Sequence, residues 1–483
     1  MSTVELLKNN IKIKQSKIAK KLRVPPKIKG NRKMYIESYG CQMNLSDSEI
    51  ITSILAKEGF SKTNDITIAD LVFVNTCSIR EKAELTVRKR LEFYNSIKRK
   101  NNPKMLVGVL GCMAERLKER FLEEEKLVDI VVGPDAYRDL PNLIQEVEDG
   151  KKAVNVMLSL EETYADINPV RLGGNGVTAF VSITRGCDNM CSFCVVPFTR
   201  GRERSRNPES IIKECTELFN NGYREITLLG QNVDSYLWYG GGAKKDFKNA
   251  SLEQQTNSLN FAHLLSKVAK INPLLRIRFS TSNPQDMSTD VIDVIANHNN
   301  ICKYIHLPVQ SGSNKILKLM KRGYTRNEYI NLIKKIKKRI PDCAISMDMI
   351  TGFCSESEQD HQETLSLMDY VKYDFGYMFK YSERPKTPAA RMEDDVPEQI
   401  KQKRLTEIIT KQQKHSFLKM KEKIGKTLEV LIEGESKKSN DYFYGRTTFN
   451  STVVFKKGKY KIGEYVMVKI QDCTSATLKG KVT

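Results

Sequence analysis

Three cysteines near the middle of the chain have the spacing of a metal-cluster loop. Cys187, Cys191 and Cys194 follow the pattern C-x-x-x-C-x-x-C, and Phe193 precedes the last of them. Three thiolates on one loop can hold an iron-sulfur cluster, and three ligands leave one iron of a four-iron cluster open to a small molecule. An open iron favours catalysis over electron transfer, which commonly uses four cysteines. A zinc loop is the alternative, but zinc spacing needs a second pair of ligands and none lies nearby.

A longer string around this loop carries a family resemblance. The loop itself resembles the signature of radical S-adenosylmethionine (SAM) enzymes, in which the methionine group of SAM occupies the open iron. The string CDNMCSFCVVPFTRGRERSR, residues 187–206, is similar to that of the methylthiotransferases, and within them to the branch that modifies tRNA. The resemblance covers residues 34 to about 480 and implies an enzyme that makes a 5′-deoxyadenosyl radical from SAM.

Three further cysteines recur after successive apolar runs of the N-terminal part. Cys41, Cys77 and Cys112 each follow a run that predicts a strand. In open α/β sheets, ligand sites form beyond the carboxyl ends of the strands, so these thiols are expected to meet at one edge. Any one of them alone would more often be a buried apolar thiol. The strings YGCQMNLSDSE, NTCSIREKAE and LGCMAER resemble the three motifs that hold an auxiliary cluster in methylthiotransferases.

The elements that must position these cysteines alternate between strand and helix over residues 34–150. Apolar runs at 71–76, 105–111 and 129–133 predict strands, and charged periodic stretches between them predict helices. Ser46 and Glu49 have the spacing of a capping box in front of the first helix. This alternation predicts an α/β domain with a doubly wound parallel sheet.

A second set of strand and helix repeats follows a linker at about 151–176 and fills residues 173–410. Six strand-helix units predict a partial (β/α)6 barrel, whose sites gather at the carboxyl ends of the strands. The Gly- and Lys-rich stretch 240–258 predicts a surface insertion. The strand patterns lie at 180–184, 225–230, 276–280, 303–307, 344–350 and 375–381.

Polar side chains at these strand ends are the candidates for binding SAM. Amides and hydroxyls there could hold the ribose and methionine groups in a mostly apolar pocket. Equally, any of them could cap a helix. Together with the aromatic residue of the cysteine loop, the cofactor-binding candidates are Phe193, Gln231, Asn232, Ser280, Ser282, Gln310 and Asp348.

Four arginines alternate directly after the cysteine loop. Arg200, Arg202, Arg204 and Arg206 would point the same way on an extended segment and form a stripe beside the active site. Because planar guanidinium groups suit phosphate pairing and base stacking, the stripe predicts RNA binding. Ion pairs inside the barrel are an equal alternative.

The positive charge of the chain lies at its two ends. The net charge is +21, and residues 1–33, a basic extension, contain 11 Lys or Arg against one acid. Residues 401–483 contain 19 Lys or Arg against 8 Asp or Glu, so residues 34–400 have a net charge of zero. Such segregation favours contact with a polyanion; solubility alone is the alternative. Short strand patterns predict a small C-terminal β-barrel at 411–483, which resembles a TRAM RNA-binding domain, or else a barrel that only docks on the enzyme.

The resemblance implies a specific reaction on tRNA. It implies two 4Fe-4S clusters, one on each cysteine triad, and two molecules of SAM. One SAM methylates a sulfur of the auxiliary cluster, and the other yields the radical that takes hydrogen from carbon 2 of N6-isopentenyladenosine, beside the anticodon. The methylthio group is then attached there. The electrons would come from a donor such as flavodoxin or ferredoxin.

Composition and rival functions complete the expectations. The chain has 11 cysteines, several of them in cluster-like spacing, and no apolar run of about eighteen residues, which predicts a cytoplasmic protein without membrane contact. We expect it to be a monomer. One rival is a sibling methylthiotransferase that acts on a ribosomal protein or on threonylcarbamoyladenosine, but the strings CQMN (41–44) and FTRG (198–201) favour the isopentenyladenosine branch. Another rival is a non-catalytic iron-sulfur protein that binds RNA.

Overall fold

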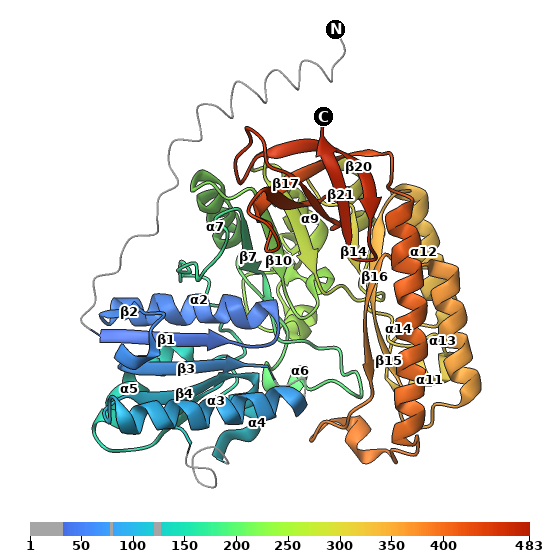
Figure 1. Cartoon of the computed structure of the whole chain (residues 1–483). Helices are drawn as coiled ribbons and strands as arrows, with labels where there is room; N and C mark the ends of the chain where they lie inside the picture. Colours follow the sequence, from blue (N-terminus) through green and yellow to red (C-terminus); the bar gives the residue numbers. More distant parts are fainter. Residues whose placement is uncertain (1–31, 78–80, 120–126) are drawn as a thin grey trace.

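The computed structural model describes residues 32–77, 81–119 and 127–483. They form an N-terminal α/β domain, a partial barrel and a small C-terminal β-barrel, which confirms the predicted fold class (Figure 1). The basic extension lies almost wholly outside the described residues. Within the described part of the chain, no helix has the length and apolar character needed to cross a membrane.

A parallel sheet with the strand order β2-β1-β3-β4-β5-β6 forms the N-terminal domain. In the central strand β3, Leu71 and Phe73 face one apolar layer while Val72 and Val74 face the other, so both faces are buried. The strands are β1 (Arg32–Ser38), β2 (Phe60–Lys62), β3 (Leu71–Thr76), β4 (Leu106–Gly111), β5 (Ile130–Val132) and β6 (Ala153–Asn155).

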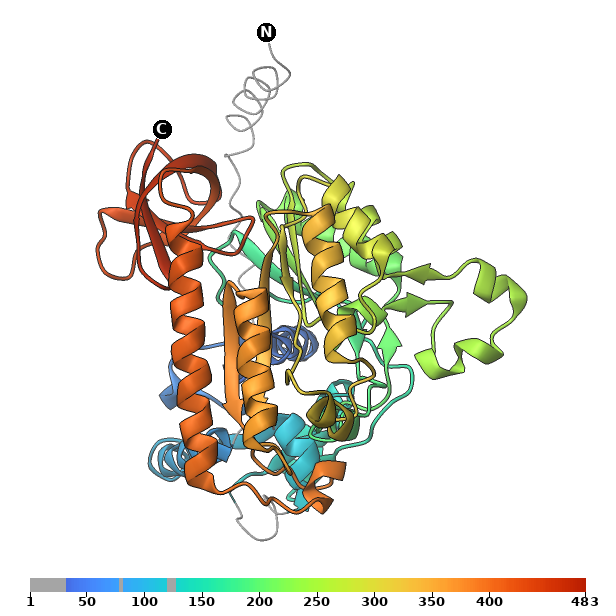
Figure 2. The same cartoon turned by 90° about the vertical axis from the view of Figure 1, so that its right-hand side faces the viewer.

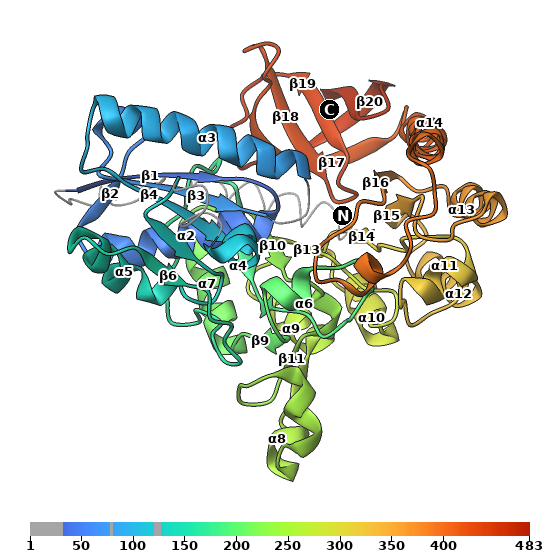
Figure 3. The same cartoon turned by 90° about the horizontal axis from the view of Figure 1, so that it is seen from below.

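Helices cover both faces of this sheet (Figure 3), as a doubly wound fold requires. On one face lie α2 (Gln42–Lys57) and α5 (Leu140–Glu148). On the other lie α3 (Glu81–Lys100) and α4 (Cys112–Glu119). Because β6 pairs with β5, the domain extends beyond the predicted end at residue 150.

The start of α2 differs from the prediction. Its N-cap is Cys41, and Ser46 and Glu49 lie inside the helix, so the predicted capping box is wrong. Glu49 instead accepts hydrogen bonds from the Arg171 guanidinium at 2.7 Å and from the Leu172 backbone at 3.1 Å. These partners belong to the segment that leads into the barrel, and a local sequence pattern does not contain them.

The partial barrel has six main parallel strands. The sheets β13-β10-β7 and β14-β15-β16 are joined by a bridge between Ile277 and Ile301. Within the described residues β7 and β16 do not pair, so the barrel is open on one side. The strands are β7 (Thr178–Ser182), β10 (Glu225–Leu229), β13 (Arg276–Ser280), β14 (Tyr304–His306), β15 (Ala344–Thr351) and β16 (Phe375–Lys380).

Helices pack on the outer face of the barrel, where Ile305, Ile345 and Met347 enter the main apolar core. The predicted insertion is an arm that projects from the barrel (Figure 2), with the short strands β11 (Leu237–Trp238) and β12 (Leu259–Asn260) at its base. The helices are α7 (Pro208–Asn220), α8 (Leu252–Thr256, in the arm), α9 (Phe261–Ala269), α10 (Thr289–Asn297), α11 (Asn314–Leu319), α12 (Arg326–Arg339) and α13 (Glu358–Val371).

The C-terminal part is a closed barrel in the order β17-β18-β19-β21-β20. The helix α14 (Glu398–Lys421) leads into it and runs unbroken through residue 411, so the barrel begins later than the predicted boundary. Its strands are β17 (Thr427–Glu435), β18 (Tyr442–Thr447), β19 (Thr452–Lys456), β20 (Tyr465–Cys473) and β21 (Thr477–Val482).

A buried carboxylate fastens this barrel to the core. Glu225, the first residue of β10, accepts hydrogen bonds from Arg276 at 2.6 Å, Arg278 at 2.8 Å and Arg446 of β18 at 2.7 Å. Burial alone would raise the pKa of Glu225, but the three guanidinium groups outweigh it and lower the pKa to about 2. The C-terminal barrel therefore docks at the amino ends of the core strands.

Candidate active site

The three N-terminal cysteines lie together at one edge of the sheet. Cys41 caps α2, Cys77 directly follows β3, and Cys112 begins α4 directly after β4. Because β1, β3 and β4 are neighbours, their carboxyl ends bring the thiols close. A hydrogen bond between Cys41 and Cys77 lowers the pKa of Cys41 to about 6 and raises the pKa of Cys77. Burial and negative charge on Cys112 raise the pKa of Cys77 further.

A glycine makes this approach possible. Gly40 has a φ of +103°, and a Cβ at this position would lie 2.3 Å from the Cβ of Cys77. Only glycine combines that backbone conformation with that contact. The loop that carries Cys41 is therefore built to pass directly against the loop that carries Cys77.

Arg200 connects this triad to the rest of the molecule. It is the C-cap of the short helix α6 (Val196–Thr199), which follows the other cysteine loop. Its Nε donates a hydrogen bond to Sγ of Cys112 at 3.1 Å, and its Nη2 donates to Asn44 at 2.9 Å and to Asp47 at 2.8 Å. A buried guanidinium at this distance stabilises negative charge on the sulfur.

Asp47 holds both ends of the second cysteine loop. It accepts hydrogen bonds of 2.8 Å from Arg185, which precedes the loop, and from Arg200, which follows it. Burial alone would raise the pKa of Asp47, but the two guanidinium groups keep it below its usual value. One ionised carboxylate of the N-terminal domain thus fixes the loop of the barrel domain.

The loop of Cys187, Cys191 and Cys194 is equally constrained. Gly186 has a φ of +76°, and a Cβ there would lie 2.0 Å from the carbonyl oxygen of Arg202, so the residue before the first cysteine must be glycine. Cys187 and Cys191 are buried. Arg322 donates a hydrogen bond to Sγ of Cys191 at 3.4 Å.

The two triads adjoin across the domain boundary. The helix α4, which begins at Cys112, packs against α6, which follows Cys194. Burial raises the pKa of Cys194 to about 12, and negative charge on Cys191 and on Cys112 adds to the effect. Thiols of both triads are therefore close enough to influence one another.

Both donor sets have the chemistry of cluster ligands, because cysteine thiolates are the usual donors to iron-sulfur clusters. One triad, Cys41, Cys77 and Cys112, would hold an auxiliary 4Fe-4S cluster, and the other would hold the cluster that binds SAM.

Buried oxygen atoms without partners mark the strand ends predicted to bind SAM. Oε1 of Gln231 and Oδ1 of Asn232 accept no hydrogen bond within the described residues. Oδ1 of Asp348 also accepts none there, although Nε2 of His306 lies 3.4 Å from it. Gln231 and Asn232 come shortly after β10, and Asp348 lies in β15. Because buried polar atoms are normally paired, these three atoms fit a site for a polar ligand.

The other predicted SAM contacts have protein partners. Ser282 donates to Asp234 at 3.2 Å, and the backbone of Gln310 donates to Asp348 at 2.9 Å. Ser280 ends β13, and Phe193 packs against the apolar cluster that contains Phe353. Their contacts with SAM stay predictions.

Asp234, Asp286 and Arg322 belong to the site but were not found from the sequence. Asp286 accepts a hydrogen bond of 2.6 Å from Asn232, and burial raises the pKa of Asp234 to about 8. Asp234 follows β10 and Asp286 follows β13, and the charge of Asp286 adds to the effect of burial on the pKa of Asp234. Asp234 follows the predicted strand end closely in sequence and could have been found, whereas the contact of Arg322 with Cys191 joins residues far apart in the chain.

The predicted stripe of arginines does not form. Arg200 and Arg204 are buried, the latter in an ion pair with Asp135, and Arg206 donates to Glu214 at 2.5 Å. Only Arg202 is exposed among the four. The alternation fails because the segment is not extended throughout: Arg200 is the C-cap of α6, Gly201 has a φ of +69°, and β9 (Arg204–Ser205) is short. The ion-pair alternative describes the three buried arginines, and the exposed Arg202 lies 3.7 Å from Asp188.

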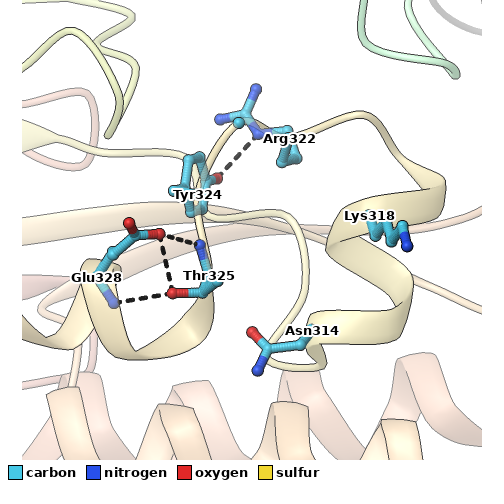
Figure 4. A pocket seen from close by; sticks show the side chains of 7 residues that line it. Asn314, Lys318, Arg322, Tyr324, Thr325 and Glu328 are labelled. Carbon is cyan, nitrogen blue, oxygen red and sulfur yellow. Dashed lines mark hydrogen bonds between the residues drawn. The ribbon is translucent and has the colours of Figure 1, made fainter.

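A surface pocket touches the site through Arg322 (Figure 4). In that pocket Arg322 donates to the Tyr324 hydroxyl at 2.9 Å, and Thr325 and Glu328 cap the helix α12. Since these groups serve the local fold, the pocket adds no chemistry to the cysteine site. Its lining residues are Asn314, Lys318, Arg322, Gly323, Tyr324, Thr325 and Glu328.

Family models match each part of the chain. Residues 181–368 match the Radical SAM superfamily. This range contains the second cysteine loop and most of the open barrel, without β16. Residues 33–133 match the uncharacterized protein family UPF0004, and residues 421–483 match the TRAM domain. The fold and the site thus define a radical SAM protein with a TRAM domain.

Full-length relatives define the family more narrowly. The tRNA-2-methylthio-N(6)-dimethylallyladenosine synthase of Christiangramia forsetii is 66% identical over 97% of this chain and 98% of its own length. The protein of the same name from Flavobacterium johnsoniae is 63% identical over the same shares. This chain belongs to the family of tRNA-2-methylthio-N(6)-dimethylallyladenosine synthases.

A solved structure shares the fold of the core. The radical S-adenosylmethionine methyltransferase TsrM from Kitasatospora setae, with cobalamin and a 4Fe-4S cluster bound, covers 74% of each chain with a TM-score of 0.52. Its sequence identity is 14%. At that identity the likeness concerns the fold alone.

Proposed function

We propose that this chain attaches a methylthio group to carbon 2 of N6-isopentenyladenosine, that is N6-dimethylallyladenosine, beside the anticodon of tRNA. The observation that carries the proposal is the junction of the two cysteine triads. Arg200, which follows one triad, donates a hydrogen bond of 3.1 Å to a cysteine of the other. Such closeness lets one bound base meet both sites, and fixed orientation of reacting groups is itself a large catalytic effect.

The bond changes define what the site must supply. No protein acid or base readily ionises an aromatic C–H bond, so the hydrogen on carbon 2 must leave as an atom. It leaves in 5′-deoxyadenosine, which forms when the bond between carbon 5′ and the sulfur of one SAM breaks and methionine leaves, and carbon 2 gains a bond to sulfur. The methyl group comes from a second SAM, which leaves as S-adenosylhomocysteine. Two bound 4Fe-4S clusters would supply reductive cleavage of SAM and the sulfur, with two electrons from a donor such as flavodoxin or ferredoxin.

The protein groups hold and orient the reactants. The unpaired oxygens of Gln231, Asn232 and Asp348 would bind the polar groups of SAM. We place the reaction on a cytoplasmic monomer, with tRNA held in part by the basic TRAM domain. The exposed lysines of that domain are Lys421, Lys426, Lys437, Lys438, Lys456, Lys459, Lys461, Lys469, Lys479 and Lys481.

Mass spectrometry of tRNA nucleosides tests this function. Anaerobic wild-type protein with SAM, reductant and isopentenylated tRNA should yield the 2-methylthio nucleoside and 5′-deoxyadenosine. Cys191→Ala should yield neither product, whereas Cys112→Ala should still cleave SAM but form no methylthio nucleoside. Cys473→Ala, at the end of β20 in the C-terminal barrel, is the matched control and should behave as wild type.

Two results would contradict the proposal, and each points to a rival. Formation of 5′-deoxyadenosine without any change in isopentenylated tRNA would favour a sibling methylthiotransferase with another substrate. Two intact clusters that never cleave SAM on reduction would favour a non-catalytic iron-sulfur protein that binds RNA.

A further inference from the structure

The inner face of the sheet β14-β15-β16 carries aromatic side chains. Partner residues on neighbouring parallel strands share a face, and the register pairs His306 with Ser346, Ser346 with Phe375, and Asp348 with Tyr377. The opposite face packs into the apolar core against the helices. Tyr304, His306, Phe375 and Tyr377 therefore line the hollow side of the open barrel; we call these four residues the aromatic face.

The aromatic face is ordered and accessible. Phe375 and Tyr377 form an edge-to-face pair at 5.0 Å, and His306 meets Tyr377 edge-on at 5.9 Å. Tyr304 and His306 are fixed by hydrogen bonds to Ser346 at 2.6 and 2.8 Å. Even so, Phe375 is 47% exposed and Tyr377 is 49% exposed. Two large rings held in place yet open to solvent on a concave face are what a stacking partner needs.

The aromatic face lies between the TRAM domain and the candidate SAM site. At the amino ends of the strands, the backbone of Lys303 donates to Thr448 of the TRAM domain at 3.0 Å. In Figure 1, β14 and β16 lie directly beneath that domain. At the other end, Asp348, a candidate SAM contact, stands opposite Tyr377 in the register. A chain that passes from the TRAM domain to the SAM site must cross the aromatic face.

We propose that the aromatic face stacks unpaired bases of tRNA that flank the target adenosine. The proposal rests on the proposed function and names a part of its substrate site. Aromatic rings bind single-stranded bases through their π faces and tolerate any sequence, which suits bases that must be splayed apart to expose one of them. The basic barrel next to this face supplies the charge that would hold the adjoining phosphates.

The test uses a stem-loop RNA with 2-aminopurine in place of each base that flanks the target. Stacking on an aromatic ring quenches 2-aminopurine, so wild-type protein should quench at least one flanking position and Tyr377→Leu should not. Tyr377→Leu, which keeps bulk but has no π face, should weaken RNA binding roughly 5- to 100-fold. Tyr377→Phe should bind as wild type. Tyr370→Ala is the matched control, because Tyr370 is also 49% exposed but lies on the outer helix α13.

An abasic flanking nucleotide provides the second arm. It should weaken binding to wild-type protein by about the factor that Tyr377→Leu causes, and should add little to the variant, since both changes remove the same contact. Equal quenching by wild type and Tyr377→Leu, or fully additive effects, would overturn the proposal and leave this face for another ligand, such as an aromatic peptide. If wild-type protein formed no methylthio nucleoside but these binding results held, the proposed function alone would fail.

Discussion

Arg200 of the radical SAM core donates a hydrogen bond of 2.8 Å to Asp47 of the N-terminal domain, and both side chains are buried. The same carboxylate binds Arg185 at 2.8 Å, on the other side of the cysteine loop. Because Arg200 also donates to Cys112, this ion pair sets the placement of one cysteine triad against the other. The linker between the domains does not need to do so.

Loss of the Asp47 carboxylate should separate the two domains. Asp47→Ala leaves Arg185 and Arg200 buried without their shared partner, which should cost on the order of 3–5 kcal/mol of stability. We expect a markedly lower thermal midpoint and faster hydrogen exchange in α2. Asp166→Ala breaks an exposed ion pair with Arg138 and should cost less than about 1 kcal/mol. Equal effects of the two variants would contradict the role of Asp47.

Arg200 should also control how firmly the proposed auxiliary cluster is held. Arg200→Lys keeps the charge but cannot reproduce the planar set of hydrogen bonds to Cys112, Asn44 and Asp47. Groups that orient metal ligands typically contribute about 10- to 100-fold in metal affinity. After reconstitution, iron should therefore leave the auxiliary site faster under a chelator, as followed by Mössbauer spectroscopy. Arg202→Lys, at the exposed neighbouring arginine, should match wild type; cluster loss at the same rate in both variants would sink the idea.

The fold was open to prediction because its strands are local apolar runs. The bounds predicted for 71–76 and 276–280 coincide with β3 and β13. The start of α2 was not predictable in this way, because Glu49 is bound to Arg171 and Leu172, more than a hundred positions further along. Capping patterns describe a helix alone, and here a contact between distant segments prevails.

The site residues also divide into those that the sequence could place and those that it could not. The six cysteines could be placed because strand ends and loop spacing are both visible in the sequence. The four arginines could not be placed, because their spacing of two residues does not reveal which carboxylates pair with them. Asp47, Asp135 and Glu214 pair with Arg200, Arg204 and Arg206. They come from α2, the turn after β5 and α7. Burial of charge is decided by such partners.

The docking of the TRAM domain should depend on pH through Glu225. Its pKa is about 2 in the folded protein and 4.5 ordinarily, so its ion pairs stabilise the fold above pH 4.5 and this stability is lost as the pH falls toward 2. Glu225→Gln should lower the unfolding free energy by about 3 kcal/mol at pH 6. In urea unfolding the difference from wild type should shrink at pH 4 and more at pH 3. A difference that stays constant over this range would exclude an ionised Glu225.

Asp234 should show the opposite dependence. Burial, opposed by the hydrogen bond from Ser282 and reinforced by the charge of Asp286, raises its pKa from 3.8 to about 8. The carboxyl group therefore stays protonated in the folded protein while the unfolded chain ionises, and wild-type stability falls as the pH rises from 3.8 to 8. Asp234→Asn cannot ionise, so its stability relative to wild type should increase over that window, by about 4 kcal/mol between pH 5 and pH 9, and then level off. Thermal midpoints at pH 5, 7 and 9 check this, with the exposed Asp342→Asn as control. A relative stability that does not change with pH would mean that Asp234 is ionised in the folded protein.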